Sequence, residues 1–239
     1  PAPLDPSMAI RPGPYVVVLG PNGVLGWCKT PTTADVYSGV VSAITQAITD
    51  AGADRADVDC VMIGTTQFTN AVIQRKSLLP VGIIRLALPA TSGIPPLTDW
   101  PDDLVNKIGR NAYLVGGGYE FDGREIAPLD EKGVAAAARD FQKNSIRAVA
   151  ITSVFSPING SMERRAAEIV QNEVPDIVVS LSCELGQFGL LPRENSTIIN
   201  AALSQLSSHV VRAFRRSLQE LDLKAPLFIS QNDGTLMRA

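Results

Sequence analysis

Two kinds of hydrophobic pattern alternate along the chain. Short apolar runs predict buried strands, and segments with apolar residues at helical spacing predict helices. Strands are expected at residues 58–64, 81–88, 146–155, 176–182 and 226–231, and helices at 33–52, 69–76, 130–144, 161–174 and 193–221. The alternation favours an α/β layered fold with a largely parallel sheet.

Two further segments predict β-hairpins. YVVVLGPNGVLGWCKT, residues 15–30, has two apolar runs joined at Pro21-Asn22-Gly23, where Asn-Gly suits positive φ. YLVGGGYEFDGREIAPLD, residues 113–130, has glycines at its corner. These hairpins make the expected sheet mixed. The proline-rich segment 89–104 predicts a long surface connection that carries Trp100.

Composition narrows the class of protein. Of the 239 residues, 45% are hydrophobic and 19% charged, which is a globular balance. The net charge of −3 gives no electrostatic reason to expect nucleic acid or a membrane surface as partner, and no apolar run reaches membrane-spanning length. Three widely spaced cysteines fit reduced thiols in a cytoplasmic protein. A single histidine, His209, leaves little room for a histidine-centred metal site or a Ser-His-Asp triad, and a structural role is expected for it.

The segment DCVMIGTTQFTNAVIQRK places hydroxyl and amide side chains where an expected strand meets a helix. Gly64 lets the chain turn there. Thr65, Thr66 and Thr69 offer hydroxyls beside the N–H groups of a helix N-terminus. Such a corner suits an anion or a carbonyl oxygen. Ordinary capping of the helix by one threonine is the alternative interpretation.

A second corner follows the last expected strand, in SQNDGTLM. Gly234 allows close approach of the backbone, Asp233 could hold a magnesium-bound water, and Thr235 could donate to a phosphate. A plain Asp-Gly turn is the alternative.

A third corner lies in LLPRENSTIINAAL, where Asn195 and Ser196 are expected to cap a long helix. Although the helical pattern can be read from residue 193, these caps would leave Arg193 and Glu194 just outside the capped helix. An arginine there could clamp a carboxylate or phosphate bidentately, and a glutamate could act as a base. A structural arginine–glutamate pair is an equal alternative.

Six segments of the chain, taken in order, resemble the hydantoinase A/5-oxoprolinase family, which includes N-methylhydantoinase and acetone carboxylase relatives. They extend from about Trp27 to Met237 and cover most of the chain. The matching segments are KTPTTADVYSGV, VMIGTTQFTNAVIQRK, EFDGREIAPLD, AVAITSVFSP, LSCELGQFGLLPRENSTIINAAL and PLFISQNDGTLM.

The resemblance implies a fold and an activity. The fold is actin/Hsp70-like (ribonuclease H-like), a mixed sheet with flanking helices, here as an incomplete two-lobed ATPase. The activity is ATP-dependent opening of a small cyclic amide such as a hydantoin or 5-oxoproline, with phosphorylation of the amide oxygen. ATP and Mg²⁺ are the implied cofactors, a hydantoinase B-like subunit or domain is the implied partner, and an oligomer is expected.

The resemblance also assigns roles to the three corners, which would line one cleft. It implies catalytic roles for Thr66, Glu194 and Asp233, with Asp233 also near the metal. It implies that residues of all three corners bind the cofactor: Gly64, Thr65, Thr69, Asn70, Arg193, Asn232, Gly234 and Thr235.

This sequence also departs from the family pattern. Relatives begin with a strand and a glycine-rich phosphate loop, where this chain has PAPLDPSMAIRPGPYVVVLG, without an Asp-Gly-Gly-Thr element. The adenosine-binding segment and the rest of the second lobe would follow the last residue, Ala239. Relatives tend to place histidines where this chain has Gln67, Tyr119 and Cys183.

Two hypotheses therefore stand. The chain is the N-terminal part of an ATP-dependent cyclic-amide hydrolase subunit, or it is a truncated or degenerate relative that acts as a binding or scaffold module without turnover. The expected organisation has a disordered or foreign leader at residues 1–14, a hydantoinase/oxoprolinase N-terminal domain at 15–192, and the start of the hydantoinase A core at 193–239.

Overall fold

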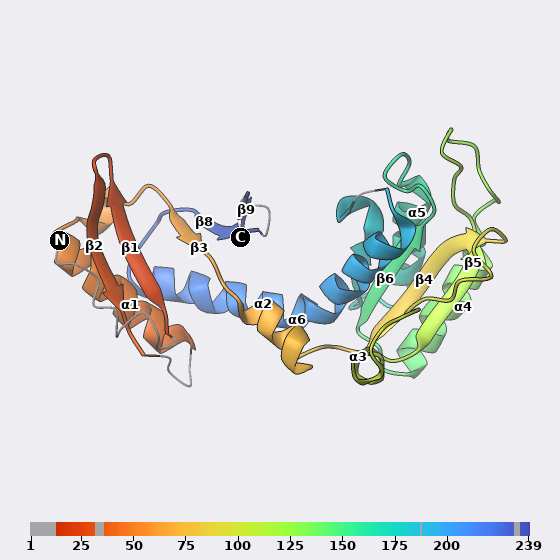
Figure 1. Cartoon of the computed structure of the whole chain (residues 1–239), viewed down its shortest axis with the longest axis horizontal. Helices are drawn as coiled ribbons and strands as arrows, with labels where there is room; N and C mark the ends of the chain where they lie inside the picture. Colours follow the sequence, from red (N-terminus) through yellow and green to blue (C-terminus); the bar gives the residue numbers. More distant parts are fainter. Residues whose placement is uncertain (1–12, 32–35, 187, 232–234) are drawn as a thin grey trace. The chain divides into compact units, whose positions relative to one another are not determined.

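The computed structural model describes residues 13–31, 36–186, 188–231 and 235–239. The chain divides into two compact units (Figure 1). Unit 1 comprises Pro1–Thr66 with Ser208–Ala239, and unit 2 comprises Gln67–Ser207. The helix α6 (Leu190–Glu220) begins in unit 2 and ends in unit 1.

Unit 1 contains two small sheets. One is the antiparallel pair β1-β2, and the other has the order β3-β8-β9, in which β3 and β8 are parallel and β9 is antiparallel to β8. The elements of unit 1 besides α6 are β1 (Tyr15–Gly20), β2 (Gly23–Lys29), α1 (Val36–Ala51), a short 3-10 helix (Arg55–Asp57), β3 (Val61–Ile63), β8 (Leu227–Ser230) and β9 (Leu236–Arg238).

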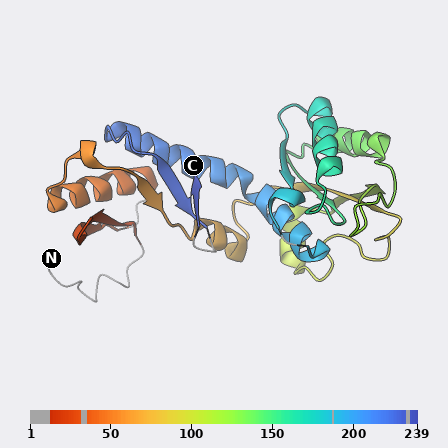
Figure 2. The same ribbon diagram turned by 90° about the horizontal axis from the view of Figure 1, so that it is seen from above.

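The core of unit 1 lies between its strands and two helices. Val40, Ile44 and Ile48 recur at helical spacing and form the buried stripe of α1. They pack with Leu218, near the end of α6, and with Leu227 of β8. Figure 2 shows α1 beside the last turns of α6.

Unit 2 is built on a four-stranded parallel sheet with the order β5-β4-β6-β7. Helices connect its strands, as parallel pairing requires. The elements are α2 (Gln67–Gln74), β4 (Val81–Leu88), α3 (Asp102–Ile108), β5 (Asn111–Gly116), α4 (Glu131–Lys143), β6 (Ala148–Ser153), α5 (Ser161–Glu173), β7 (Val178–Leu181) and a short 3-10 helix (Ser182–Glu184).

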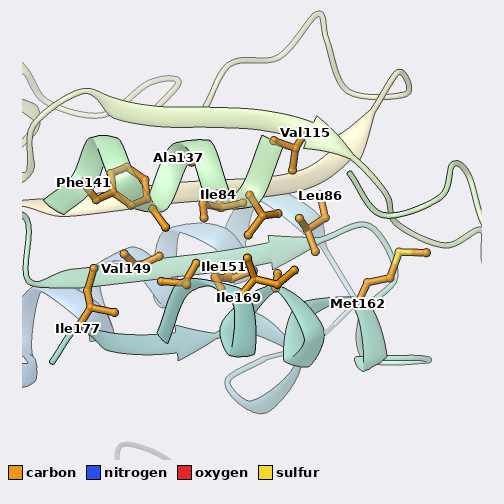
Figure 3. Packing of buried hydrophobic residues seen from close by; sticks show 14 of the residues in the cluster. Ile84, Leu86, Val115, Ala137, Phe141, Val149, Ile151, Met162, Ile169 and Ile177 are labelled. Carbon is orange, nitrogen blue, oxygen red and sulfur yellow. The ribbon is translucent and has the colours of Figure 1, made fainter. Parts of the chain in front are cut away.

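Helices cover both faces of this sheet. Neighbouring residues of a strand point to opposite sides, so each strand buries side chains on both faces. Ile84 of β4 and Ile151 of β6 face α4 and α5, where they meet Phe141 and Ile169 (Figure 3). Ile83 and Ala150 face the other way, toward α3 and the first half of α6. The near-continuous apolar runs of β4 and β6 follow from this double burial.

The α/β class expected from the sequence is confirmed, with mixed sheets and flanking helices. The first hairpin is confirmed, with Gly23 at a φ of 119° after the turn. His209 is exposed on α6. No helix within the described residues is both long and apolar enough to cross a bilayer.

The second expected hairpin is wrong. Strand β5 pairs with β4 in parallel, and the residues after it form one isolated antiparallel bridge, between Tyr119 and Glu125. Gly117 and Gly118 have φ values of 142° and 94°, which only glycine adopts readily. The Cβ of any other residue at 118 would lie 2.8 Å from the Leu86 carbonyl oxygen. The glycines therefore bring the chain close to the end of β4.

Two further elements were not expected. Helix α3 occupies the end of the proline-rich connection, with Leu104, Val105 and Ile108 buried at helical spacing. The connection is also less superficial than expected, since Trp100 is half-buried and its indole N–H donates to the Asn195 side chain at 2.9 Å. Strand β9 was missed because the sequence around it has no alternating pattern of its own.

Candidate functional site

The first two corners meet at one edge of the β3-β8 pair. These strands are parallel, and Ile63 pairs with Ile229, so both chains leave the sheet on the same side. A Cβ placed on Gly64 would lie 3.2 Å from the Ser230 hydroxyl oxygen. The glycine that opens the first corner is thus next to the last residue of β8.

The side chains at this edge are accessible. Gly64, Thr66, Ser230 and Gln231 are exposed, and Thr65 is half-buried. Hydroxyls and backbone N–H groups at the carboxyl end of parallel strands suit ligands that carry oxygen atoms, such as phosphates. The described residues here can therefore offer hydrogen-bond donors to an oxygen-rich ligand.

The second corner is only partly within the described residues. The Gln231 N–H donates to the Thr235 carbonyl at 2.8 Å, which brings these two residues together. Asn232, Asp233 and Gly234 lie outside the described residues. Thr235 is exposed beside them. Among the residues that are described, no cluster of three or more acidic, histidine or cysteine side chains could hold a metal ion.

Thr69 and Asn70, the remaining residues of the first corner, lie in the first turn of α2. Both are exposed. They belong to unit 2, whereas Gly64, Thr65 and Thr66 belong to unit 1. Helix α2 begins at Gln67, two residues before its expected start.

The third corner differs from its expected form. Helix α6 begins at Leu190, so Arg193 and Glu194 lie inside its first turns rather than outside them. Pro192 suits the first turn, where no N–H donor is needed, and this explains the earlier start. Asn195 therefore does not begin the helix.

Glu194 is fully buried and forms an ion pair with Arg85 of β4. The Arg85 Nε donates to Glu194 Oε1 at 2.8 Å and its Nη2 donates to Oε2 at 2.5 Å. A third nitrogen of Arg85 donates to the Ile94 carbonyl. Both carboxylate oxygens of Glu194 thus accept hydrogen bonds from Arg85.

Arg193 does not pair with Glu194; it enters a buried network between the ends of β6 and β7. Its Nε donates to the Ser182 hydroxyl at 3.0 Å, and its Nη2 donates to the Ser153 carbonyl at 2.5 Å. Burial lowers the pKa of Arg193, and the nearby Glu163 carboxylate opposes that effect. The guanidinium is therefore held by carbonyl and hydroxyl oxygens rather than exposed for an anion.

Glu163 of α5 is the acidic centre of the same network. Its Oε1 accepts from the Ser153 N–H at 2.7 Å and from the Ser182 hydroxyl at 2.6 Å. Its Oε2 accepts from the Cys183 N–H at 2.9 Å. Burial, followed by the charge of Glu163, raises the pKa of the Cys183 thiol to about 12. Cys183 is therefore a neutral thiol at physiological pH.

Sequence reasoning missed Arg85, Glu163 and Ser182. Arg85 had a detectable signal, because it is the one charged residue in the otherwise apolar strand VGIIRLAL. A cation in a doubly covered strand requires a buried partner. Glu163 and Ser182 occupy ordinary positions of a helix and a strand end, and nothing in the sequence distinguishes them.

The comparisons with known proteins agree with the resemblance seen in the sequence. A family model described as the hydantoinase/oxoprolinase N-terminal region matches residues 15–174. The caprolactamase subunit alpha of Pseudomonas jessenii is 28% identical over 203 residues, which are 76% of this chain and 27% of that protein. An uncharacterized protein of Methanocaldococcus jannaschii is 28% identical over 222 residues. The match covers 86% of this chain and 32% of that protein.

Two solved structures share the fold. The ATP-dependent caprolactamase from Pseudomonas jessenii superposes with a TM-score of 0.69 and 26% identity, over 88% of this chain and 33% of that one. The nucleotide-free structure of acetone carboxylase superposes with a TM-score of 0.69 and 18% identity. The match covers 89% of this chain and 33% of that one. The match agrees with the expected actin/Hsp70-like class. The chain spans about a third of the length of the relatives it matches. The chain belongs to the hydantoinase/oxoprolinase family, of which it carries the N-terminal region.

Proposed function

We propose that this chain is the N-terminal part of an ATP-dependent cyclic-amide hydrolase subunit. The observation that carries the proposal is the meeting of Gly64 with Ser230 at one edge of the β3-β8 pair, which joins two corners that the family resemblance assigns to the nucleotide. A relative with a solved structure is an ATP-dependent caprolactamase, and caprolactam is a cyclic amide.

The chemistry requires activation of the substrate. The carbonyl of a lactam is a poor electrophile because the ring nitrogen donates electron density to it. Transfer of the terminal phosphoryl group of ATP to the amide oxygen releases ADP and makes the ring carbon electrophilic. Water adds to that carbon, the C–N bond breaks as the nitrogen takes up a proton, and the resulting acyl phosphate is hydrolysed by a second water to a carboxylate and inorganic phosphate. Most of the protein's contribution to such a transfer is positioning and stabilisation of charge.

In this proposal the first corner contacts the reacting groups. Thr66 orients the phosphoryl group or the amide oxygen through its hydroxyl. Gly64 and Thr65 contribute backbone and side-chain donors, and Thr69 and Asn70 extend the donors along the first turn of α2.

The second corner forms the other phosphate-binding turn. Asn232, Gly234 and Thr235 would contact phosphate oxygens, and Asp233 would hold Mg²⁺, directly or through a bound water. The magnesium ion neutralises phosphate charge when it is bound.

The third corner requires a change before it can act. Arg193 would contact phosphate and Glu194 would serve as a base, yet Glu194 is paired with Arg85 and Arg193 is buried. Both proposed roles therefore require that the start of α6 rearranges when substrate or a partner binds. The start of the proposed core domain, at residue 193, falls within this same part of α6.

The proposal includes a partner and a setting. One relative is named as an alpha subunit, and this supports a hydantoinase B-like partner subunit or domain and an oligomeric assembly. We place the protein in the cytoplasm, in keeping with its unpaired cysteines.

A second candidate function is a non-catalytic binding or scaffold module. Two observations favour it: the segment before β1 has no glycine-rich phosphate loop, and Arg85 occupies both oxygens of Glu194. In this case the family fold is retained and turnover is lost.

The test is isothermal titration of magnesium-ATP and of a non-hydrolysable analogue, on this chain expressed with any coding sequence that flanks it. We expect binding, and at least about a tenfold loss in Thr66→Val, since a hydrogen bond to a charged group contributes about 1.5–3 kcal/mol. Thr49→Val, at an exposed threonine of α1, is the control and should leave binding unchanged. A folded protein that gives no nucleotide heat would favour the non-catalytic candidate.

A further inference from the structure

The sequence contains two Asn-Gly dipeptides, and the structure places them in opposite environments. Asn22 lies in the turn that joins β1 to β2, and Gly23 is the first residue of β2 (Figure 1). Asn159 and Gly160 lie directly before α5 in unit 2. An asparagine followed by glycine can cyclise, because no side chain on the glycine hinders attack by its backbone nitrogen. The fold around each dipeptide then decides whether the reaction proceeds.

The dipeptide of the hairpin is open on all sides. Asn22 and Gly23 are both exposed. A Cβ placed on Gly23 would meet no heavy atom within 4 Å. Among the residues that the structure describes, none is hydrogen-bonded to the Asn22 side chain. Neither packing nor a hydrogen bond therefore fixes this side chain, and water reaches both residues.

The dipeptide before α5 is held in place. The Asn159 Oδ1 accepts from the Ser161 N–H at 3.0 Å, so this side chain caps the start of the helix. The Ser161 hydroxyl lies 2.6 Å from the Tyr119 hydroxyl oxygen. Gly160 is buried, and a Cβ placed on it would lie 2.8 Å from the Cys183 Sγ. Cyclisation at Asn159 therefore requires that the cap breaks and the packing opens locally.

We propose that Asn22 is a site of spontaneous deamidation in the folded protein and that the fold protects Asn159. Base removes the Gly23 amide proton, and the nitrogen attacks Cγ of Asn22. The N–Cγ bond forms, the Cγ–Nδ2 bond breaks, and Nδ2 takes up a proton and leaves as ammonia. Water then opens the succinimide ring at either of its carbonyls, which gives aspartate or isoaspartate. This inference does not depend on nucleotide binding.

Either product changes the hairpin in a way that can be measured. Each adds one negative charge to a chain whose net charge is −3, and isoelectric focusing detects this charge. Isoaspartate also lengthens the backbone by one carbon, in a turn whose flanking residues Gly20 and Gly23 are paired. Fragmentation of the peptide that contains residue 22, in a mass spectrometer, distinguishes the two products.

The test follows both dipeptides in the full protein at mildly alkaline pH. After incubation the protein is digested, and the conversion of each Asn-Gly peptide is measured by mass spectrometry. The same incubation in guanidinium chloride gives the rate of each dipeptide in the unfolded chain, which corrects for the neighbouring residues. Relative to these unfolded rates, we expect Asn159 to be slowed at least about tenfold more than Asn22, because only Asn159 must open first.

Two substitutions complete the test. Asn22→Gln should remove the first acidic form that appears in the aged folded protein, because glutamine must close a larger ring. Asn159→Gln is the matched control and should leave the appearance of that form unchanged. The proposal is overturned if folding slows Asn22 as much as Asn159, if Asn22 stays intact in the folded protein while the unfolded chain is converted, or if Asn22→Gln acquires the charge at the rate of the parent.

Discussion

Both units have polar residues beside parallel strands, but the environments of these residues differ. In unit 2, Arg85, Glu163 and Glu194 are fully buried, and each has a hydrogen-bonded partner. In unit 1, Gly64 and Thr66 are exposed beside Ser230. A charged residue beside a parallel sheet therefore does not by itself indicate a ligand site. Its partners decide whether it can meet a ligand.

Loss of the ion pair of unit 2 should destabilise the protein most. Arg85→Met should destabilise the protein by about 3–5 kcal/mol, because it leaves the Glu194 carboxylate buried and unpaired. The measurement is urea unfolding followed by circular dichroism. If Arg85→Met unfolds at the urea concentration of the parent, Glu194 is not held as described, and the contrast between the two units fails.

The matched control for this prediction is the double variant Arg85→Met with Glu194→Leu. It removes both charges and keeps similar volumes, so most of the lost stability should return. A double variant as unstable as Arg85→Met alone would indicate that packing, rather than the unpaired charge, explains the effect.

A smaller loss is expected in the second network of unit 2. Ser182→Ala removes the hydroxyl that donates to Glu163 and accepts from Arg193. The loss should be about 1–3 kcal/mol, because both buried groups lose one partner. Ser196→Ala removes an exposed hydroxyl of α6 that donates to the Pro192 carbonyl, and it should change stability by less than about 0.5 kcal/mol. Equal effects of the two variants would contradict the central position of Ser182.

The exposed edge of unit 1 should behave in the opposite way. Thr66→Val should change the free energy of unfolding by less than about 0.5 kcal/mol, since its side chain is exposed. The same variant is expected to weaken nucleotide binding. A loss of stability comparable to that of Ser182→Ala would assign Thr66 a structural role, and the helix-capping interpretation would then be preferred.

The fold was predictable where periodicity was strong. The run VGIIRLAL gave β4 with its observed bounds, and Asn-Gly identified the first hairpin. The glycines at 116–118 led to the wrong prediction of a second hairpin, because glycine permits a hairpin corner and a close backbone approach equally well. Only the observed pairing of β5 with β4 separates these two outcomes.

The candidate site was less predictable, for a physical reason. The sequence identified the corners but not the partners of the charged residues. Arg193 and Glu194 are adjacent in the chain, yet the helix turns them toward different neighbours, Ser182 and Arg85. Such partners are far apart in sequence, since Arg85 and Glu194 are separated by 109 positions, and no local pattern encodes them.

A further effect is expected at Cys183, and it is absent at neutral pH. Its pKa is raised from 9.0 to about 12 in the fold, chiefly by burial. Between these values the unfolded chain releases the thiol proton and the folded protein retains it, so the unfolded state is favoured and stability falls as pH rises. The difference in unfolding free energy between the parent and Cys183→Ala should therefore be constant near pH 7 and shift against the parent above about pH 9. Urea unfolding of both proteins across this range measures it, and contributions from Cys28 and Tyr113, whose pKa values are also raised, cancel in the comparison. A constant difference up to pH 11 would mean that the thiol ionises as readily in the fold as in the unfolded chain, and that Glu163 and the burial around it do not act on Cys183.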